Sequence, residues 1–318
     1  MTQAAATTSA TRPPVRPPAP IWAESVVITF AFHCNLACTF CMVEDVLETP
    51  YPGMDIERFR TMVERRDPAL HGMRRIVLSG GEVTTTRKLP EYVAVARSLP
   101  GLEHVRIQTN AVRLADADYA RSLVEAGVDE FFVSIHGADA ATCDGITRLP
   151  GSFANIVEGM RNVVRVGGTL ITNTCIVAAN HRELPGIVDL VAPIGPQSME
   201  FWNYWPRVHE RAADFVVPVR EARPFVIEAL SRAIGRSVPP VVRWFPRCLL
   251  PSELKPYHDD GQPQLLIEER FWDREPQYNC VFSGSCAEFG SKSCSGLSNA
   301  YVQQFGWEEG LLVPSPSR

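Results

Sequence analysis

Short apolar runs alternate with longer segments of helical period from Ser25 to about residue 236. Most of the short runs are apolar at nearly every position, as strands are when both faces of their sheet are covered. This alternation predicts repeated βα units and a parallel sheet. The candidate strands are residues 26–32, 75–79, 104–108, 130–135, 169–177 and 198–204.

The longer segments can be tested by their spacing. The clearest helix precedes Gly167 and Gly168 and carries one apolar stripe, formed by Phe153, Ile156, Val157, Met160, Val163 and Val164. Asp55 can cap a second helix, a third spans residues 116–126 and ends at Gly127, and residues 221–234 form the last helix. Six strand–helix units are too few for an eight-unit barrel. The sequence therefore predicts an α/β fold, a partial (β/α)6 TIM-type barrel.

The regular pattern stops after about Ser237, and the remaining residues are rich in Pro, Gly, Trp and Cys. Such a segment needs a metal, or docking onto a neighbour, to be stable. We expect three parts: a disordered Pro-rich tail (1–22), the partial barrel (23–236) and a small irregular Cys-rich C-terminal extension (237–318).

Composition narrows the function classes. The 318 residues are 45% hydrophobic and carry a formal net charge of −5, with no run of Lys and Arg, so we expect a globular protein that binds neither nucleic acid nor membrane. The first twenty residues have no apolar core typical of a signal peptide. Nine cysteines without an export signal indicate a reducing compartment, so we expect a cytoplasmic protein whose cysteines bind metal.

Three of these cysteines, Cys34, Cys38 and Cys41, directly follow the first strand. Functional groups of parallel α/β folds gather at the carboxyl ends of strands, so this position favours a site. The spacing C-x3-C-x2-C differs from that of ribbon-type zinc sites. Three thiolates suit an iron–sulfur cluster in which one iron stays open for a chelating molecule. Structural or zinc-binding cysteines are the alternative.

The motif resembles that of the radical S-adenosylmethionine (SAM) superfamily, C-x3-C-x-aromatic-C, with Phe40 at the aromatic position. This resemblance implies that Cys34, Cys38 and Cys41 hold a [4Fe-4S] cluster whose open iron chelates SAM. Electron transfer then cleaves SAM to a 5′-deoxyadenosyl radical, which abstracts hydrogen from a substrate. The electrons would come from a flavodoxin- or ferredoxin-type reductant.

Polar groups follow the other predicted strands. Gly80, Gly81 and Glu82 resemble the GGE motif of the superfamily, which implies contact with the methionyl amino group of SAM, although Val83 replaces a common proline. The resemblance also implies further cofactor-binding residues at the third and fourth strand ends: Asn110, Ser134 and His136. For His136, a bond to a loop carbonyl is an equal alternative. Weaker candidates near SAM or substrate are Asn173, Thr174, Trp202, Asn203 and Trp205.

Four cysteines lie in the C-terminal extension: Cys248, Cys280, Cys286 and Cys294. Four thiolates can saturate a zinc ion or a second cluster. The segment resembles the auxiliary-cluster extensions of SPASM and twitch-type radical SAM enzymes, although its spacing differs from the standard SPASM pattern. We expect an auxiliary iron–sulfur cluster, with structural zinc or unligated cysteines as alternatives. We expect Cys175 to be a buried thiol. For Cys143 we expect a packing role, with donation of a hydrogen atom to a substrate radical as the alternative.

The sequence thus predicts an oxygen-sensitive radical SAM enzyme that acts on a small molecule. The short Pro-rich tail cannot fold into a leader-recognition module, which argues mildly against the alternative substrate, a ribosomally made peptide. In another class, the chain is a non-catalytic iron–sulfur or zinc-binding protein. Substrate identity, reaction outcome and oligomeric state do not follow from the sequence.

Overall fold

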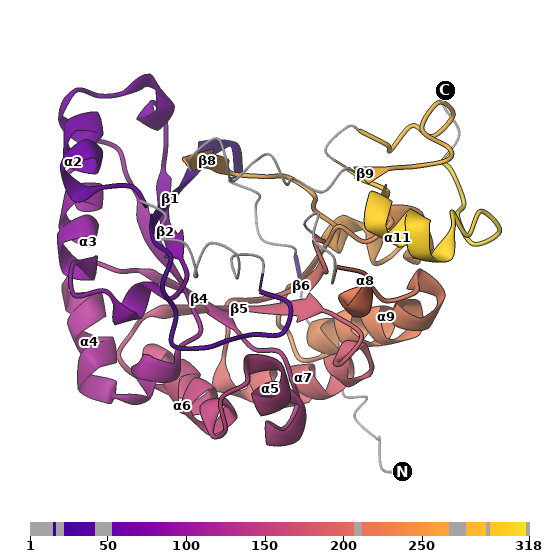
Figure 1. Cartoon of the computed structure of the whole chain (residues 1–318), viewed down its shortest axis with the longest axis horizontal. Coiled ribbons are helices and arrows are strands. Elements are labelled where there is room, and N and C mark those ends of the chain that lie inside the picture. The colour runs from indigo at the N-terminus through magenta and orange to yellow at the C-terminus, as the bar shows by residue number, and fades with distance from the viewer. Residues whose placement is uncertain are drawn as a thin grey trace, which may run out of the picture.

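The computed structural model describes residues 15–16, 22–41, 53–206, 212–266, 278–290 and 293–315. Most of the predicted N-terminal tail lies outside these residues. Eight parallel strands form one curved sheet in the order β7-β6-β5-β4-β3-β2-β1-β8, with helices on its outer side (Figure 1). Because β7 and β8 are the two edges of the sheet, the barrel is open. The strands are β1 (Ser25–Ala31), β2 (Arg75–Gly80), β3 (His104–Thr109), β4 (Glu130–Ser134), β5 (Thr169–Ile176), β6 (Ser198–Asn203), β7 (Pro240–Arg243) and β8 (Gln264–Leu266).

The predicted α/β partial barrel and its six strands are confirmed, and the sheet has two strands more than we predicted. Strands β7 and β8 come from the segment after Ser237 and extend the same sheet past β6 and past β1. Both strands are too short, at four and three residues, to show a hydrophobic period in the sequence. The sheet therefore continues beyond the boundary that we predicted at residues 236 and 237.

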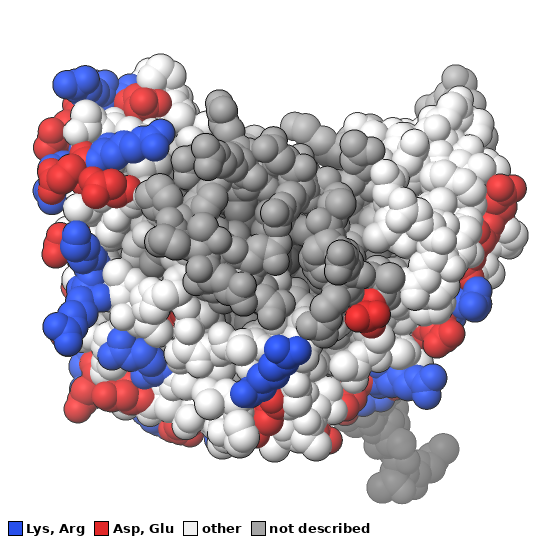
Figure 2. All heavy atoms as spheres, viewed as in Figure 1, with Lys and Arg blue, Asp and Glu red and all other residues white. Residues whose placement is uncertain are grey.

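Local sequence signals set the ends of the helices. Asp55 caps α2 by accepting hydrogen bonds from backbone N–H groups, as predicted, and Asp116 caps α4 in the same way. In α6, however, Val164 is 38% exposed and lies off the buried stripe. The α-helices are α2 (Ile56–Glu64), α3 (Leu89–Arg97), α4 (Ala117–Glu125), α5 (Ala140–Thr147), α6 (Ser152–Arg165), α7 (Leu184–Val191), α8 (Ala212–Phe215), α9 (Val219–Gly235) and α11 (Asn299–Phe305). Charged side chains of both signs are mixed over the helical side, whereas the surface over α11 is largely uncharged (Figure 2).

The C-terminal residues are fastened to the barrel by buried polar contacts. The carboxylate of Asp260 accepts the backbone N–H of Trp244 at 2.6 Å and that of Ser295 at 2.7 Å. On the other side, the hydroxyl of Tyr301 in α11 accepts the backbone N–H of Val219 at the start of α9 (2.8 Å). A small antiparallel pair, β9 (Tyr278–Asn279) and β10 (Leu297–Ser298), holds the segment itself together.

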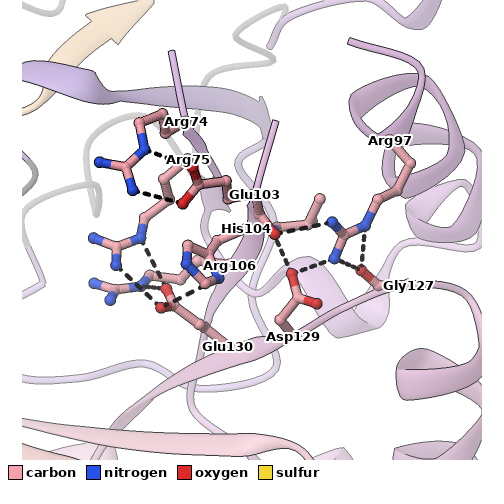
Figure 3. Close-up of polar contacts among 10 residues, drawn as sticks. Arg74, Arg75, Arg97, Glu103, His104, Arg106, Gly127, Asp129 and Glu130 are labelled. Carbon is pink, nitrogen blue, oxygen red and sulfur yellow. Dashed lines mark hydrogen bonds and ion pairs between the residues drawn. The ribbon is translucent and has the colours of Figure 1, made fainter. Parts of the chain in front are cut away.

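A buried ion cluster joins the amino-terminal parts of β2, β3 and β4 (Figure 3). Glu130, which begins β4, accepts hydrogen bonds from Nε of Arg106 at 2.8 Å and from Nη2 of Arg75 at 3.0 Å, and all three side chains are largely buried. Burial alone raises the pKa of Glu130, but the attraction of the two arginines outweighs it, so the pKa lies below its ordinary value. The carboxylate therefore stabilises the start of the sheet in its ionised form.

We predict that Glu130→Gln lowers the free energy of unfolding by about 3–5 kcal/mol, because two buried guanidinium groups lose their counter-ion. A carboxyl group with a depressed folded pKa stabilises the fold above its unfolded pKa, about 4.3, and loses this effect as the pH falls through the folded value. Urea unfolding at several pH values should therefore show the variant and wild type converging in acid.

The matched control is Glu158→Gln, which also removes a carboxylate placed between two arginines, Arg161 and Arg165, but on the exposed face of α6. Its effect should stay below about 1 kcal/mol. Equal losses for the two variants would contradict the role assigned to Glu130.

Candidate active site

One cavity of about 360 Å³ occupies the interior of the barrel, among the described residues. Its lining is mostly apolar, with polar groups at the carboxyl ends of strands β1 to β5. All of the barrel residues that we predicted for the cluster and for SAM line it: Cys34, Cys38, Phe40, Cys41, Gly80, Gly81, Glu82, Asn110, Ser134 and His136. Parallel strands bring their carboxyl ends to one edge of the sheet, so residues far apart in sequence meet here.

The loop with the three cysteines is held at fixed points by its backbone. The N–H groups of Ala37 and Thr39 donate to the carbonyl oxygens of Thr147 (3.2 Å) and Ile146 (2.9 Å), at the end of α5. The side-chain amide of Asn110 lies 3.8 Å from the sulfur of Cys34. The contact between Asn110 and Cys34 places a residue from the end of β3 beside this thiol.

The opposite side of this loop packs against the residues that follow β2. A Cβ atom on Gly81 would lie 2.3 Å from the carbonyl oxygen of His33 and 2.5 Å from that of Phe32, so only glycine fits. Gly80 has a φ of 153°, a value that side chains disfavour. The backbone N–H of Glu82 donates to the same His33 oxygen at 2.8 Å. The two loops thus approach each other backbone to backbone.

The carboxylate of Glu82 faces its own loop and the end of β3. It accepts from the hydroxyl and N–H of Thr84 (2.6 and 3.0 Å), the hydroxyl of Thr109 (2.6 Å) and the N–H of Asn110 (2.5 Å). Burial raises the pKa of Glu82, and these four donors oppose that effect. The carboxylate therefore joins two loops, and its expected contact with a ligand ammonium stays a prediction.

Burial disfavours the thiolate forms of two cysteines of this loop, Cys34 and Cys38. Burial raises the pKa of Cys34 to about 11, partly offset by the N–H of Leu36. Burial also raises the pKa of Cys38, where the neighbouring thiols add to the effect. Metal binding must then displace these protons, which links the affinity of the site for metal to pH.

His136 is neutral and its tautomer follows from its contacts. Burial lowers the pKa of His136 to about 4. Its Nδ1 accepts the backbone N–H of Cys175 at 3.3 Å, so the proton lies on Nε2, which can donate a hydrogen bond. The ring contacts Phe40 edge to face at a centroid distance of 4.9 Å.

Among the weaker candidates, Asn173, Trp202, Asn203 and Trp205 line the cavity. Thr174 is not a lining residue of the described cavity, and its hydroxyl donates to the carbonyl oxygen of Ile135. Of the two remaining cysteines, Cys143 is fully buried in α5, which confirms the packing role that we expected. Cys175, expected to be an ordinary buried thiol, lines the cavity instead. Alternation along β5 could have predicted this, had its register been known.

Sequence reasoning missed the residues that close the other end of the cavity. Arg106 and Arg243 point inward from β3 and β7, and Trp22 and Trp244 stand beside them. The sequence marks these residues only by an arginine within or beside an apolar strand, and that pattern is not specific to a functional site.

A second, smaller cavity of about 20 Å³ lies in the C-terminal segment. Its lining includes all four cysteines of that segment, Cys248, Cys280, Cys286 and Cys294, together with Phe282, Phe289, Leu297 and Leu312. Burial raises the pKa of Cys294 to about 12. Among the described residues, no three His, Cys, Asp or Glu side chains are close enough to hold a single metal ion. The four thiols surround a space instead.

Residues 28–191, slightly more than half of the chain, match the family model described as the radical SAM superfamily. The chain therefore belongs to this superfamily, whose members are enzymes that use a [4Fe-4S] cluster and SAM. Membership confirms the predicted enzyme class and sets aside the non-catalytic alternative.

Curated relatives include GTP 3′,8-cyclases. The enzyme of Pelotomaculum thermopropionicum is 29% identical over 217 residues, which cover 67% of this chain and 64% of that protein. The enzyme of Chlorobaculum tepidum is 32% identical over 172 residues, which cover 52% and 49%. The chain thus spans about half to two thirds of the length of these relatives.

Solved structures share the fold at low identity. The hydrogenase maturase HydG from Carboxydothermus hydrogenoformans has a TM-score of 0.57 at 12% identity, covering 76% of this chain and 58% of that one. SuiB from Streptococcus suis bound to its precursor peptide SuiA has a TM-score of 0.51 at 14% identity, covering 66% and 47%. At these identities the likeness shows the fold alone. In the described part of the chain, no helix has the length and apolar character needed to cross a membrane.

We predict that Gly81→Ala lowers both the melting temperature and the iron bound after anaerobic reconstitution, because its methyl group would displace the cysteine loop at Phe32 and His33. Gly145→Ala is the control, since a Cβ there meets no atom within 4 Å and alanine favours the helix α5. If Gly81→Ala bound as much iron as wild type and melted at the same temperature, the fit between the two loops would not control the site.

Proposed function

We propose that Cys34, Cys38 and Cys41 hold the [4Fe-4S] cluster, and that the enzyme abstracts hydrogen from a small-molecule substrate in the adjoining cavity. One observation carries this proposal: all three thiols line the same mostly apolar cavity as the polar residues at the ends of the neighbouring strands. The cluster and SAM supply the one-electron cleavage of a sulfonium and the hydrogen-abstracting species.

The donor set fits this group. Three sulfur atoms match the preference of cluster irons for thiolates. The N–H of Leu36, at 3.4 Å, and the amide of Asn110 lie within reach of the Cys34 sulfur. Hydrogen bonds to a ligand sulfur tune the reduction potential of a cluster. Asn110 therefore serves as a positioning residue for Cys34 rather than only as a contact for SAM.

The protein's own contribution is orientation and exclusion of water. His136 offers its Nε2–H, and Ser134 and Asn173 offer polar groups from adjacent strands in register with each other. Phe40 and Phe132 provide apolar walls, which keep water away from a reactive carbon. We assign the SAM-contacting role to Gly80, Gly81 and Glu82. Three of the four donors to the Glu82 carboxylate share Oε1, so Oε2, which accepts only the N–H of Asn110 among the described residues, can still accept from a ligand ammonium.

A small molecule is the favoured substrate. The curated relatives are named for a reaction of GTP, a small molecule, and the cavity of about 360 Å³ is at the lower end of the range for a single drug-sized ligand. The peptide-bound SuiB shares only the fold, so it does not favour a peptide. We further propose a flavodoxin- or ferredoxin-type electron donor and a cytoplasmic location.

We also propose that Cys248, Cys280, Cys286 and Cys294 hold an auxiliary iron–sulfur cluster. Support comes from the lining of one small cavity by all four thiols, although they are up to 46 positions apart in the chain. Gly296 permits this arrangement, because a Cβ there would lie 2.3 Å from the carbonyl oxygen of Asn279, next to Cys280. Four thiolates complete the coordination of a cluster that binds no further ligand.

The principal test is anaerobic cleavage of SAM. The reconstituted chain with dithionite and SAM should form 5′-deoxyadenosine, and Cys34→Ala, Cys38→Ala and Cys41→Ala should each fall to the level of a protein-free mixture. Cys143→Ala is the matched control, because this buried thiol is absent from the described lining. Wild type that forms no 5′-deoxyadenosine, or cysteine variants that form as much as wild type, would refute the assignment.

Metal analysis tests the auxiliary cluster. We expect about eight iron atoms per wild-type chain and about four in the double variant Cys248→Ala, Cys286→Ala. Cys143→Ala should retain the wild-type iron content. About four iron atoms together with one zinc in the wild type would identify the small cavity as a zinc site instead.

A further inference from the structure

The cavity wall formed by β5, by the end of β6 and by β7 carries buried N–H groups without partners. Among the described residues, these are Nδ2 of Asn173, Nε1 of Trp205, Nε1 of Trp244, and Nε and Nη1 of Arg243. Every one of these atoms is a hydrogen-bond donor, and every residue lines the cavity. A buried polar group without a partner in the free protein indicates a ligand that supplies one.

Arg243 is the charged member of this wall. Its side chain is 1% exposed, and its guanidinium carbon lies 4.1, 5.0 and 5.3 Å from the ring centres of Trp22, Trp244 and Trp202. One nitrogen, Nη2, donates to the carbonyl oxygen of Gly261. Glu200, Asp259 and Asp260 attract the guanidinium, but no carboxylate of the described residues lies within ion-pair distance of it. Burying a guanidinium without a directly paired counter-ion is costly, so an entering anion would be favoured.

The other charged groups of the cavity lining have direct partners. Arg106 shares the carboxylate of Glu130 with Arg75, and the carboxylate of Glu82 is held by four donors. Glu200, which attracts Arg243 most strongly, accepts the indole N–H of Trp202 at its Oε2 (2.7 Å). Among the described residues, Arg243 is therefore the charged lining residue whose own donors, Nε and Nη1, still lack partners.

The methionyl carboxylate of SAM is not the missing anion. Arg243 stacks on Trp22, which precedes β1, whereas the cysteine loop follows the other end of that strand. A strand of seven residues spans about 23 Å, so a group chelated at the cysteine loop does not reach Arg243. The site must belong to a second molecule in the same cavity.

The shape of the wall indicates the rest of that molecule. Trp205 and Trp244 stack at a centroid distance of 4.8 Å, and Trp202 meets Trp244 edge to face at 5.0 Å. Together they form a broad aromatic surface beside the free donors, which suits a planar or apolar body attached to an acidic group.

We infer that the substrate is a small organic oxyanion, a phosphate or a carboxylate, whose acidic group binds Arg243 with help from the indole N–H groups of Trp205 and Trp244. This inference rests on the proposed function and names the substrate class. GTP, for which the curated relatives are named, combines a planar base with phosphates and is therefore a suitable probe.

The test uses the full, reconstituted chain and four probes. Calorimetry compares GTP with guanosine, which lacks the phosphates, and tryptophan fluorescence follows inorganic triphosphate and citrate. Four of the six tryptophans line the cavity, so fluorescence reports on it directly. We expect at least one anion to bind more tightly than guanosine. Comparing the binding of triphosphate with that of citrate shows whether the site prefers a phosphate or a carboxylate.

Arg243→Gln should weaken binding of the anion by roughly 30-fold or more and leave guanosine unchanged, with Arg243→Lys between the two. Trp205→Phe, which keeps the ring and removes the N–H, should weaken it about 3- to 10-fold. This second variant keeps the test valid if Arg243→Gln does not fold. Arg220→Gln and Trp307→Phe, outside the described lining, are the matched controls.

Anions that bind the wild type no better than guanosine, or that bind Arg243→Gln and Trp205→Phe as tightly as wild type, would overturn the inference. Formation of 5′-deoxyadenosine is measured on the same preparation. Cleavage of SAM without anion preference refutes only the inference, whereas absence of cleavage refutes the proposed function.

Discussion

The contact of Gly81 with the carbonyl oxygens of Phe32 and His33 is the constraint on which the site depends. It permits the loop after β2 to lie directly against the cysteine loop, and the N–H of Glu82 then fixes the separation between them. The carboxylate of Glu82 extends the same connection to the end of β3 through Thr109. Three consecutive strand ends are thereby locked together, so the thiols are positioned by backbone packing before any cofactor binds.

The cavity differs in character along its length. At the cysteine end it is bounded by Phe40 and a neutral His136, which favour a dry environment. At the far end it is bounded by arginines, of which Arg106 is directly paired with Glu130, whereas Nε and Nη1 of Arg243 have no partner among the described residues. Radical chemistry requires the first environment and charge recognition requires the second. The open barrel accommodates both because each strand contributes a residue at each level.

The sequence was informative wherever position along a strand determines function. The six longer strands and the meeting of Cys34, Gly81 and Ser134 followed from the rule that parallel strands end at one edge. The strands β7 and β8 are too short to show a hydrophobic periodicity in the sequence. The role of Arg243 depends on tryptophans from distant parts of the chain, a contact that no local pattern specifies. The orientation of the Glu82 carboxylate likewise depends on a partner loop whose distance only the fold sets.

Asp260 gives the C-terminal segment a part in building the substrate pocket. Its two oxygens hold the backbone of Trp244, in the wall of the large cavity, and that of Ser295, next to Cys294 in the small one. The final form of the large cavity therefore depends, through this one carboxylate, on the assembly of the small cavity. During synthesis the barrel strands emerge first, so the aromatic wall of the large cavity takes its final form only after the last cysteines are in position.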